Sequence, residues 1–560
     1  MRSVLYVLAA LLVLPALLIN LGAVPFIDDE AIRALVAWEM LETGNFVAPT
    51  MHGDTYLNKP PGWNWVLALS FTLFGGASEY ATRVPTVVAV LGFAMAAFFL
   101  TRRYLGTYLA VVHALTIITC GRMLFWDSML GLIDVCFSGF VFVQLVLLYH
   151  FGHRGQWWAA FGWSYGLLVV TFLLKGLPAI VFQGLTVLAV LGWTRSWRQF
   201  FRPPHLVSGA LSTCALALYY LAYSQYVDLS LVIERLFIES GKRTAAAHSL
   251  GETLGHVLVF PFEMPYHFLP WTALLLLAVH PRARRAVREH DFAGYCLVVF
   301  LVNLPVYWLS PNVYPRYLLM LFPLLFVPLL VMWARSQVEG GEWMKKGLTY
   351  LFLVAMTISS VGLFLVPLIP ETAGVAGRWV WAVGLGLLSS GLTYLVWTDR
   401  RPERPDFLLT LGCFLLLLRL ALSVFVLPAR GAGDVRGLAV RDSAVSTMRT
   451  VGSERAVAVY GFSLIEPATG YYLSLARNDL VRRQWEEFDR TTVYIVSPAQ
   501  YPEIADRLTV ADSVYLRHQQ LWYPVGTFDD PPVGRAPIVK ELRDGMGTGI
   551  PLNKPRAPKR

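Results

Sequence analysis

Carboxylates and cationic side chains recur in the polar segments that separate the apolar runs of this 560-residue chain. A carboxylate can act as a general base that removes the proton from an attacking hydroxyl. Lys and Arg can bind a phosphate and offset the negative charge that grows on it as it leaves. The residues of these types that we expect at one end of the apolar runs are Asp28, Asp29, Glu30, Lys59, Arg83, Arg122, Asp127, Asp134, Lys175, Arg243, His248 and Arg316.

The composition indicates which elements must position these side chains. Of all residues 56% are hydrophobic and only 15% are charged, and the mean hydropathy is +0.54. A water-soluble domain of this length would need more polar surface, so the sequence predicts a mostly α, polytopic membrane protein. The net charge of +9 is spread over short clusters between apolar runs. That distribution gives topology signals and excludes a nucleic-acid-binding face.

About thirteen runs are long and apolar enough for a membrane-spanning helix, which needs roughly 20 residues. They lie near 4–25, 80–100, 107–121, 129–149, 157–174, 176–193, 206–224, 266–280, 292–309, 316–334, 347–369, 377–397 and 405–427. With a cytoplasmic N-terminus, every alternate loop carries Arg or Lys, which is the positive-inside pattern. An odd number of spans then places the C-terminal region outside the cytoplasmic membrane.

On this topology the charged residues given above lie at or near the outer face, and none of them lies near mid-bilayer. Transporters place charges or broken helices near the midplane. Clustering at one face instead predicts a site that works at one membrane surface and draws its substrate from the lipid.

The expected domains are a membrane domain (1–428), whose long outer loops are 26–79 and 225–265, a soluble extracytoplasmic α/β domain (429–545) and a flexible tail (546–560). Long loops inside a compact protein are usually functional. The elements expected in the soluble domain are strands Ala456–Gly461 and Thr492–Val496 and a helix Pro467–Leu475.

A surface helix is expected in the first outer loop. Asp28 can cap it and Gly44 can end it. The residues of its apolar stripe are Ile32, Leu35, Val36 and Met40. Such a stripe is typical of a helix that lies in the membrane surface.

Residues 26–75 resemble the first outer loop of bacterial GT-C glycosyltransferases, in particular the lipid A aminoarabinose transferases and protein O-mannosyltransferases. The features that carry the resemblance are Asp29-Glu30, Glu39-Met40, a Gly-aromatic turn, Tyr56-x-x-Lys59-Pro60, Arg83-Val84-Pro85, LIDVCF around Asp134, Leu174-Lys175-Gly176, Pro270-Trp271 and Ser310 through Arg316-Tyr317. The resemblance implies a GT-C fold and a polyprenyl-phosphate-linked sugar donor, with a lipid, glycan or protein as acceptor among the membrane lipids.

The same resemblance implies roles for individual residues. Asp29 matches the catalytic base, Lys59 the phosphate-binding lysine, and Arg316 with Tyr317 a position that faces the carrier phosphate. The further candidates for substrate binding are Glu30, Arg33, Arg83, Asp134, Lys175, Arg243 and His248.

Several alternatives stay open at this point. Asp29 can instead cap a helix, and Lys59 can extend to the headgroups. Asp134 and Lys175 can form a structural ion pair. The metal and cofactor are unknown: a divalent metal is compatible, but the family's metal site uses a Glu where this chain has Asn58.

Two other functions also fit the sequence. One is a protein O-glycosyltransferase, in which the acceptor is a protein instead of an envelope lipid or glycan. The other is a non-enzymatic lipid or polysaccharide exporter, which needs essential charges in the bilayer interior and tolerates substitution of Asp29.

Overall fold

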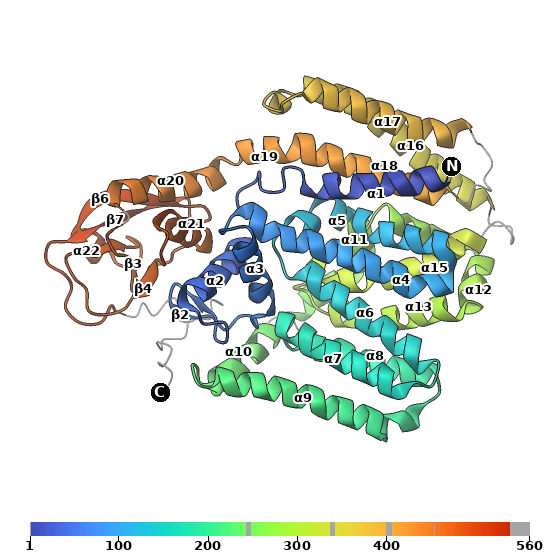
Figure 1. The fold of residues 1–560 in the computed structure, drawn as a ribbon, viewed down its shortest axis with the longest axis horizontal. Helices are drawn as coiled ribbons and strands as arrows, with labels where there is room; N and C mark the ends of the chain where they lie inside the picture. The colour runs from blue at the N-terminus through green and yellow to red at the C-terminus, as the bar shows by residue number, and fades with distance from the viewer. Residues whose placement is uncertain are drawn as a thin grey trace. The chain divides into compact units, whose positions relative to one another are not determined.

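A computed structural model describes residues 2–27, 29–241, 248–335, 342–398, 406–452 and 454–537. Contacts within the chain divide it into two compact units (Figure 1). The helical unit comprises Met1–Leu21, Arg83–Ala217 and Phe237–Ala429. The mixed unit comprises Gly22–Thr82, Leu218–Leu236 and Arg430–Arg560.

Most of the chain up to residue 433 is helical. The helices are α1 (Arg2–Leu18), α2 (Glu30–Thr43), α3 (Gly62–Leu73), α4 (Glu79–Thr119), α5 (Gly121–Phe125), α6 (Asp134–Gly152), α7 (Trp157–Lys175), α8 (Pro178–Trp193), α9 (Pro203–Tyr223), α10 (Leu229–Gly241), α11 (Leu250–His267), α12 (Pro281–Arg288), α13 (Asp291–Asn303), α14 (Pro305–Trp308), α15 (Phe322–Arg335), α16 (Glu342–Leu365), α17 (Arg378–Thr398), α18 (Phe407–Ala421) and α19 (Leu427–Gly433). Short 3-10 helices cover Asp127–Met129, Trp197–Phe201, Trp271–Val279, Pro315–Met320, Val366–Leu368 and Pro370–Thr372, and a π-helix covers Leu422–Val426.

Among the described residues, eight helices are long and apolar enough to cross a membrane. Three shorter apolar helices, α1, α8 and α15, accompany them. Apolar side chains such as Phe99, Ile358 and Val380 are more than half exposed on these helices, as lipid-facing residues are. The chain is therefore a multi-pass membrane protein.

The helices differ in length from the predicted runs. The 41-residue α4 contains two of these runs, separated by Gly106, whose φ of 75° and ψ of 165° are not helical. The run predicted at 266–280 holds only a 3-10 helix, Trp271–Val279, and the run at 176–193 holds the 16-residue α8. Hydropathy identifies apolar segments, but contacts with neighbouring helices decide how much of each segment is regular helix.

The first outer loop is an ordered part of the mixed unit. Helix α2 ends at Thr43 and is capped by Gly44, the residue predicted to end it, which adopts the left-handed conformation (φ 68°). A hairpin follows, in which β1 (Thr50–Met51) pairs with β2 (Asp54–Thr55) in antiparallel fashion. Ten of the fourteen residues of α2 are buried, on every side of the helix, because α2 packs against α3 and α21. The prediction of a one-faced helix on the membrane surface is therefore wrong.

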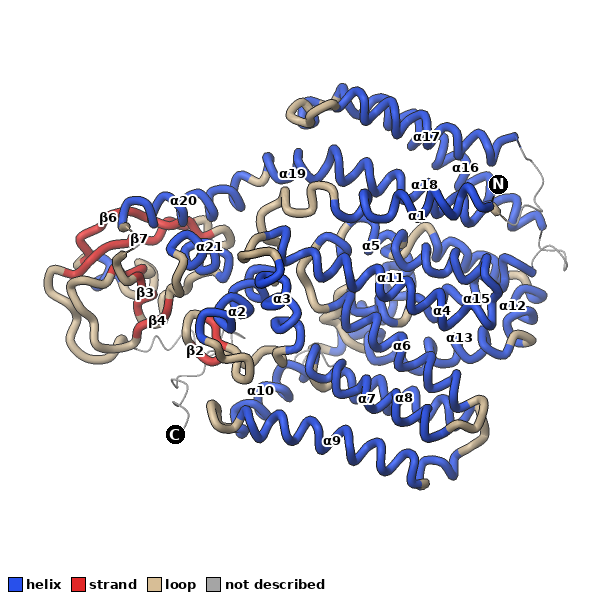
Figure 2. Tube along the Cα trace, in the orientation of Figure 1, coloured by secondary structure: helices blue, strands red, loops and turns tan. Residues whose placement is uncertain are grey.

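The C-terminal part of the mixed unit is the α/β layer predicted from its alternating patterns (Figure 2). Its elements are α20 (Val435–Val451), β3 (Val457–Tyr460), α21 (Pro467–Arg477), β4 (Arg482–Gln484), β5 (Val493–Ile495), α22 (Pro502–Ala505), β6 (Leu508–Leu516) and β7 (Leu521–Phe528). The sheet has the order β4-β3-β5-β7-β6. Strand β3 runs parallel to β4 and β5, and β7 runs antiparallel to β5 and β6.

The grouping of segments differs from the expected domains. The first outer loop and residues after 429 belong to one unit, whereas the sequence analysis assigned the loop to the membrane domain. The second loop, 225–265, contains α10 and α11. The tail 546–560 and the end of the soluble domain beyond 537 lie outside the described residues.

Candidate active site

The proposed base, Asp29, occupies the N-cap position of α2. Its side chain makes no capping hydrogen bond, and it is partly exposed to solvent. A capping Asp is expected to accept a bond from a backbone N–H in the first turn. The geometry therefore leaves the Asp29 carboxylate available for other contacts at a helix end that favours negative charge. Asp28, the residue predicted to cap the helix, lies outside the described residues.

The neighbouring candidates in α2 are held by protein contacts. Glu30 is fully buried and accepts a hydrogen bond from the backbone N–H of Ile27 at 2.9 Å. Arg33 is 5% exposed, and its Nη1 donates to the hydroxyl of Tyr56 at 2.5 Å. The carbonyl of Arg33 also accepts from the side-chain amide of Asn64 at 3.0 Å. These contacts indicate that Glu30 and Arg33 shape the loop around Asp29.

Lys59 lies in the segment between the hairpin and α3. It is partly exposed, whereas Pro60 and Pro61 behind it are buried. Two consecutive prolines restrict the backbone, and Pro61 takes the N-cap position of α3. The lysine is therefore presented from a stiff segment that belongs to the same unit as Asp29.

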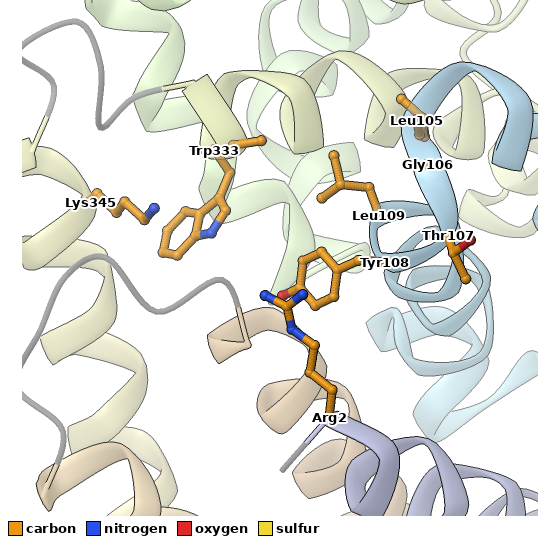
Figure 3. Close-up of a pocket in the computed structure, with 9 residues that line it drawn as sticks. Arg2, Leu105, Gly106, Thr107, Tyr108, Leu109, Trp333 and Lys345 are labelled. Carbon is orange, nitrogen blue, oxygen red and sulfur yellow. The ribbon is translucent and has the colours of Figure 1, made fainter.

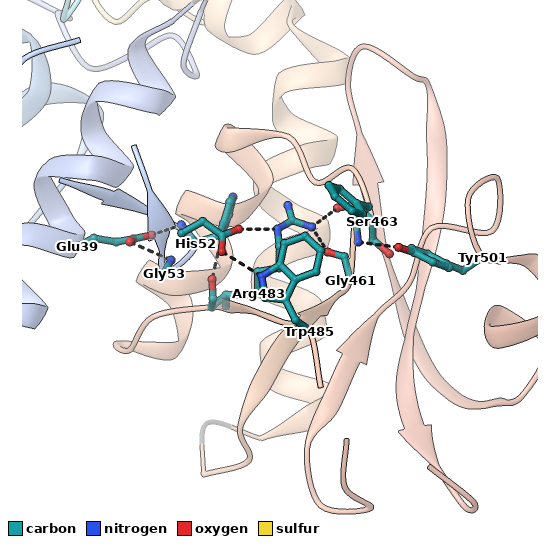
Figure 4. A network of polar contacts seen from close by, with 11 residues as sticks. Glu39, His52, Gly53, Gly461, Ser463, Arg483, Trp485 and Tyr501 are labelled. Atoms are coloured by element: carbon teal, nitrogen blue, oxygen red, sulfur yellow. Dashed lines mark hydrogen bonds and ion pairs between the residues drawn. The ribbon is translucent and has the colours of Figure 1, made fainter. Parts of the chain in front are cut away.

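A buried polar network joins the hairpin to the sheet within the mixed unit (Figure 4). Arg483 on β4 forms an ion pair with Asp54, with 3.1 Å between Nε and Oδ2. Its guanidinium also donates to the carbonyls of Gly461 and Ser463. The indole N–H of Trp485 donates to Asp54 Oδ1 at 3.1 Å. The network also includes a backbone hydrogen bond, in which the N–H of Arg483 donates to the carbonyl of His52 at 2.8 Å.

The hairpin turn is fixed from both sides. On one side, Glu39 of α2 accepts from the Thr50 hydroxyl at 2.7 Å and from the N–H groups of His52 and Gly53. On the other side, the His52 ring lies so close to α21 that a Cβ added at Gly470 would come within 2.0 Å of it. Burial raises the pKa of Glu39 to about 7 and lowers the pKa of His52 to about 4. The hairpin that precedes Lys59 is thus held by α2, α21 and β4 together.

The helical unit contains a second cluster of predicted site residues. Lys175, at the end of α7, donates to Asp134 at the start of α6, with 2.5 Å between Nζ and Oδ1. Arg316 Nε lies 3.5 Å from the other carboxylate oxygen. The Lys175 ammonium also lies 4.2 Å from the centre of the Tyr317 ring. Asp134 and Lys175 therefore form the predicted ion pair, and their role in substrate binding stays a prediction.

The other candidates of the helical unit are separate from this cluster. Arg83 is 1% exposed and donates to the carbonyl of Leu21 at 2.9 Å. That contact joins the start of α4 to the turn that follows α1. His248 lies next to the N-cap Ser249 of α11, with Nδ1 3.8 Å from Glu252. Arg243 lies outside the described residues.

No metal ligand set emerges from the part of the chain that the structure describes. Within it, no group of three or more His, Cys, Asp or Glu side chains has the arrangement of a metal site. The Asn58 oxygen, at the position of the family's acidic residue, is buried without a hydrogen-bond partner in that part. None of the residues described here is assigned to a cofactor.

Sequence reasoning missed several residues that the structure makes prominent. His52, Asp54 and Arg483 are polar residues without a recognisable motif, and their contacts join segments far apart in the sequence. Arg419 is a buried arginine inside α18, 1% exposed, whose Nη1 donates to Ser423 at 3.2 Å. It lies within the predicted span 405–427, and its single positive charge among leucines was the available signal.

Comparisons with known proteins show which proteins this chain is similar to. Residues 58–222 match the family model described as dolichyl-phosphate-mannose-protein mannosyltransferase. An undecaprenyl phosphate-alpha-4-amino-4-deoxy-L-arabinose arabinosyl transferase of Pseudomonas aeruginosa (strain LESB58) is 28% identical over 306 residues, which are 52% of this chain and 53% of that protein. A protein of the same name from Edwardsiella ictaluri (strain 93-146) is 27% identical over 206 residues, 36% of this chain and 35% of that protein.

The chain thus spans about half the length of the curated relatives that it matches. Its fold is similar to that of ArnT from Cupriavidus metallidurans bound to undecaprenyl phosphate, with a TM-score of 0.66 at 18% identity. That match covers 94% of this chain and 98% of the other. The resemblance to GT-C glycosyltransferases of the aminoarabinose transferase and protein O-mannosyltransferase type is confirmed.

Proposed function

We propose that this chain is a membrane glycosyltransferase that moves a sugar from a polyprenyl-phosphate carrier to an envelope lipid or glycan. The observation that carries the proposal is the Asp29 carboxylate, which stands at the N-cap of α2 without a capping bond in a region that resembles GT-C enzymes. The named relatives make undecaprenyl phosphate carrying 4-amino-4-deoxy-L-arabinose the first donor to test.

In the proposed reaction Asp29 removes the proton from the acceptor hydroxyl. The oxygen attacks the anomeric carbon from the face opposite the carrier, while the bond from that carbon to the phosphate oxygen breaks. The carrier phosphate leaves with an additional negative charge, which Lys59 offsets. Arg316 and Tyr317 have the phosphate-facing role that the resemblance implies.

The proposed orientation places the mixed unit and the loops 26–79 and 225–265 outside the cytoplasmic membrane, with about thirteen spans of roughly 20 residues. It rests on the basic alternate loops. In a variant without the exposed Cys214, a cysteine at Val510 should react with an impermeant reagent on intact spheroplasts, and one at Trp343 should react only after lysis. The reverse result would overturn this orientation.

The decisive experiment is the variant Asp29→Asn, which keeps size and hydrogen bonding but removes the base. Transfer from purified polyprenyl-phosphate sugar in nanodiscs should fall by about a hundred- to ten-thousand-fold, with the unfolding temperature and carrier binding unchanged. Asp442→Asn makes the same chemical change on α20, where the side chain is 70% exposed, and should keep full activity. Wild-type turnover by Asp29→Asn would remove the catalytic assignment, whereas absence of transfer by the wild type itself would favour the exporter.

A protein acceptor is the second candidate, because the matching family model describes protein mannosyltransferases. Mass analysis of envelope lipids and glycoproteins from a deletion strain separates the two. Loss of a sugar from glycoproteins alone would select the second candidate.

A further inference from the structure

A pocket of about 350 Å³ lies among the ends of four helices of the helical unit (Figure 3). The residues that give it its chemistry are Arg2, Thr107, Tyr108, Trp333 and Lys345. None of them belongs to the candidate active site described above. The pocket therefore needs an explanation of its own.

Lys345 in the first turn of α16 is the most informative residue. It is only 3% exposed, and its ammonium lies 4.8 Å from the centre of the Trp333 ring. Across the described ranges, the ammonium has no carboxylate within ion-pair distance. The nearby acid, Glu342, lies 3.8 Å from the exposed Lys346 instead. A buried cation without a counter-charge is costly, so the position favours an anion in the pocket.

The opposite wall contains a cation that already has a partner. Arg2 forms an ion pair with Asp406, and its guanidinium lies 5.1 Å from the centre of the Tyr108 ring. Figure 3 shows the Trp333 ring between Lys345 and the Arg2 guanidinium, and the Tyr108 ring beside that guanidinium. Arg2 is paired with Asp406, whereas Lys345 is a cation of the pocket lining for which the described residues supply no carboxylate within ion-pair distance.

A helix N-terminus and exposed apolar side chains near the pocket indicate which kind of anion it binds. The second half of α4 begins after the break at Gly106, and its first residues line the pocket, so a helix N-terminus adds positive potential. On α16, beyond Lys345, Leu351, Val354 and Ile358 are each more than half exposed, as a wall for lipid chains would be. Basic residues at a membrane surface attract anionic lipid headgroups.

We propose that this pocket binds the phosphate headgroup of an anionic membrane lipid, with Lys345 as its counter-ion and Trp333 and Tyr108 as its apolar walls. The site is distinct from the carrier site and does not depend on the transferase reaction. On the proposed topology it takes its lipid from the cytoplasmic leaflet.

The test compares the whole protein in nanodiscs of phosphatidylcholine alone and of phosphatidylcholine mixed with phosphatidylglycerol. Phosphatidylglycerol should raise the unfolding temperature of the wild type but not of Lys345→Met. Native mass spectrometry should show phosphatidylglycerol retention reduced roughly tenfold or more in that variant, as expected for loss of a charge-assisted contact. Lys346→Met removes an exposed charge from the same helix and should behave as the wild type.

Two results would overturn the proposal. One is equal stabilisation of Lys345→Met and the wild type by phosphatidylglycerol. The other is binding of inorganic phosphate that depends on Lys345 without any preference for phosphatidylglycerol, which would indicate a free-phosphate site. If Lys345→Met does not fold, Lys345→Gln serves as the second uncharged variant in the same comparison, and measurable wild-type lipid retention by Lys345→Gln would equally refute the site.

Discussion

Arg483 Nε lies 3.1 Å from Asp54 Oδ2, and this ion pair joins strand β4 of the C-terminal sheet to the hairpin that precedes Lys59. The Asp54 and Arg483 side chains are only 10% and 3% exposed. A contact of this kind makes the C-terminal part of the mixed unit a support for the loop that carries the proposed base and phosphate ligand.

Asp54→Asn should destabilise the mixed unit by about 3–5 kcal/mol, because it leaves the buried Arg483 without its counter-charge. Hydrogen exchange of residues 50–55 should rise accordingly. The double variant Asp54→Asn/Arg483→Met should recover part of the loss, because no buried charge remains uncompensated. Asp442→Asn disrupts the exposed pair with Arg441 and should cost no more than about 1 kcal/mol. Unchanged exchange in Asp54→Asn would contradict the supporting role.

Lys59→Ala should weaken binding of the polyprenyl-phosphate carrier by roughly ten- to a hundredfold, the usual effect of losing a hydrogen bond to a charged group. It should also slow transfer at saturating donor, since the contact strengthens as the leaving phosphate gains charge. Carrier titration and single-turnover transfer measure the two effects separately. Lys346→Ala, at a lysine that is 48% exposed, provides the control. Normal carrier affinity in Lys59→Ala would rule out the phosphate contact.

Lys175→Met and Asp134→Asn should each lower the unfolding temperature, because each breaks the buried 2.5 Å ion pair, even though Arg316 still lies 3.5 Å from Asp134 in Lys175→Met. The combined variant should be more stable than either single variant. The KM for donor of the folded protein should stay near the wild-type value if the pair is structural. A large rise in KM without any loss of stability would instead show that Lys175 contacts the substrate.

Glu39→Gln should change how stability depends on pH. The pKa of Glu39 is raised from 4.5 to about 7, so folded Glu39 keeps a proton that the unfolded chain has released in that range. Its stabilising contribution is present below pH 4.5 and is lost as the pH rises through about 7. The stability of the wild type relative to Glu39→Gln should therefore fall across this window, by on the order of 3 kcal/mol at most.

The lowered pKa of His52 has the opposite effect on stability. Both the wild type and Glu39→Gln contain His52, so its effect cancels in the stability difference between them. Thermal unfolding at a series of pH values measures the change. Glu454→Gln, the same change at an exposed position of the same unit, is the control. A constant difference for Glu39→Gln would contradict the raised pKa.

Local signals in the sequence predicted much of the fold. Gly44 marked the end of α2, and short runs of β-type residues marked β3 and β5. The number of regular spans was less predictable, because a single non-helical residue, Gly106, separates two runs inside α4. A hydropathy profile does not show a break in the helical backbone of this kind.

The candidate site was predictable only where a family motif exists. Asp29, Lys59 and Glu39 lie in motifs, but no motif indicates the tertiary contacts that give Glu39, His52 and Arg483 their roles. The Glu39 carboxylate, for example, became informative only once the hairpin N–H groups were seen to surround it. Pairing of residues so distant in sequence leaves no periodicity that a single chain can reveal.

The discontinuous mixed unit also sets an order of events during synthesis. Its first segment ends at residue 82 and its last begins at residue 430, so 347 residues separate them along the chain. At roughly 5–20 residues per second, a ribosome needs about 20–70 s to reach the later segment. During that interval the nascent Asp54 and His52 have neither Arg483 nor the β4 backbone to bind. The loop therefore cannot complete its own fold until the last part of the chain has been synthesised.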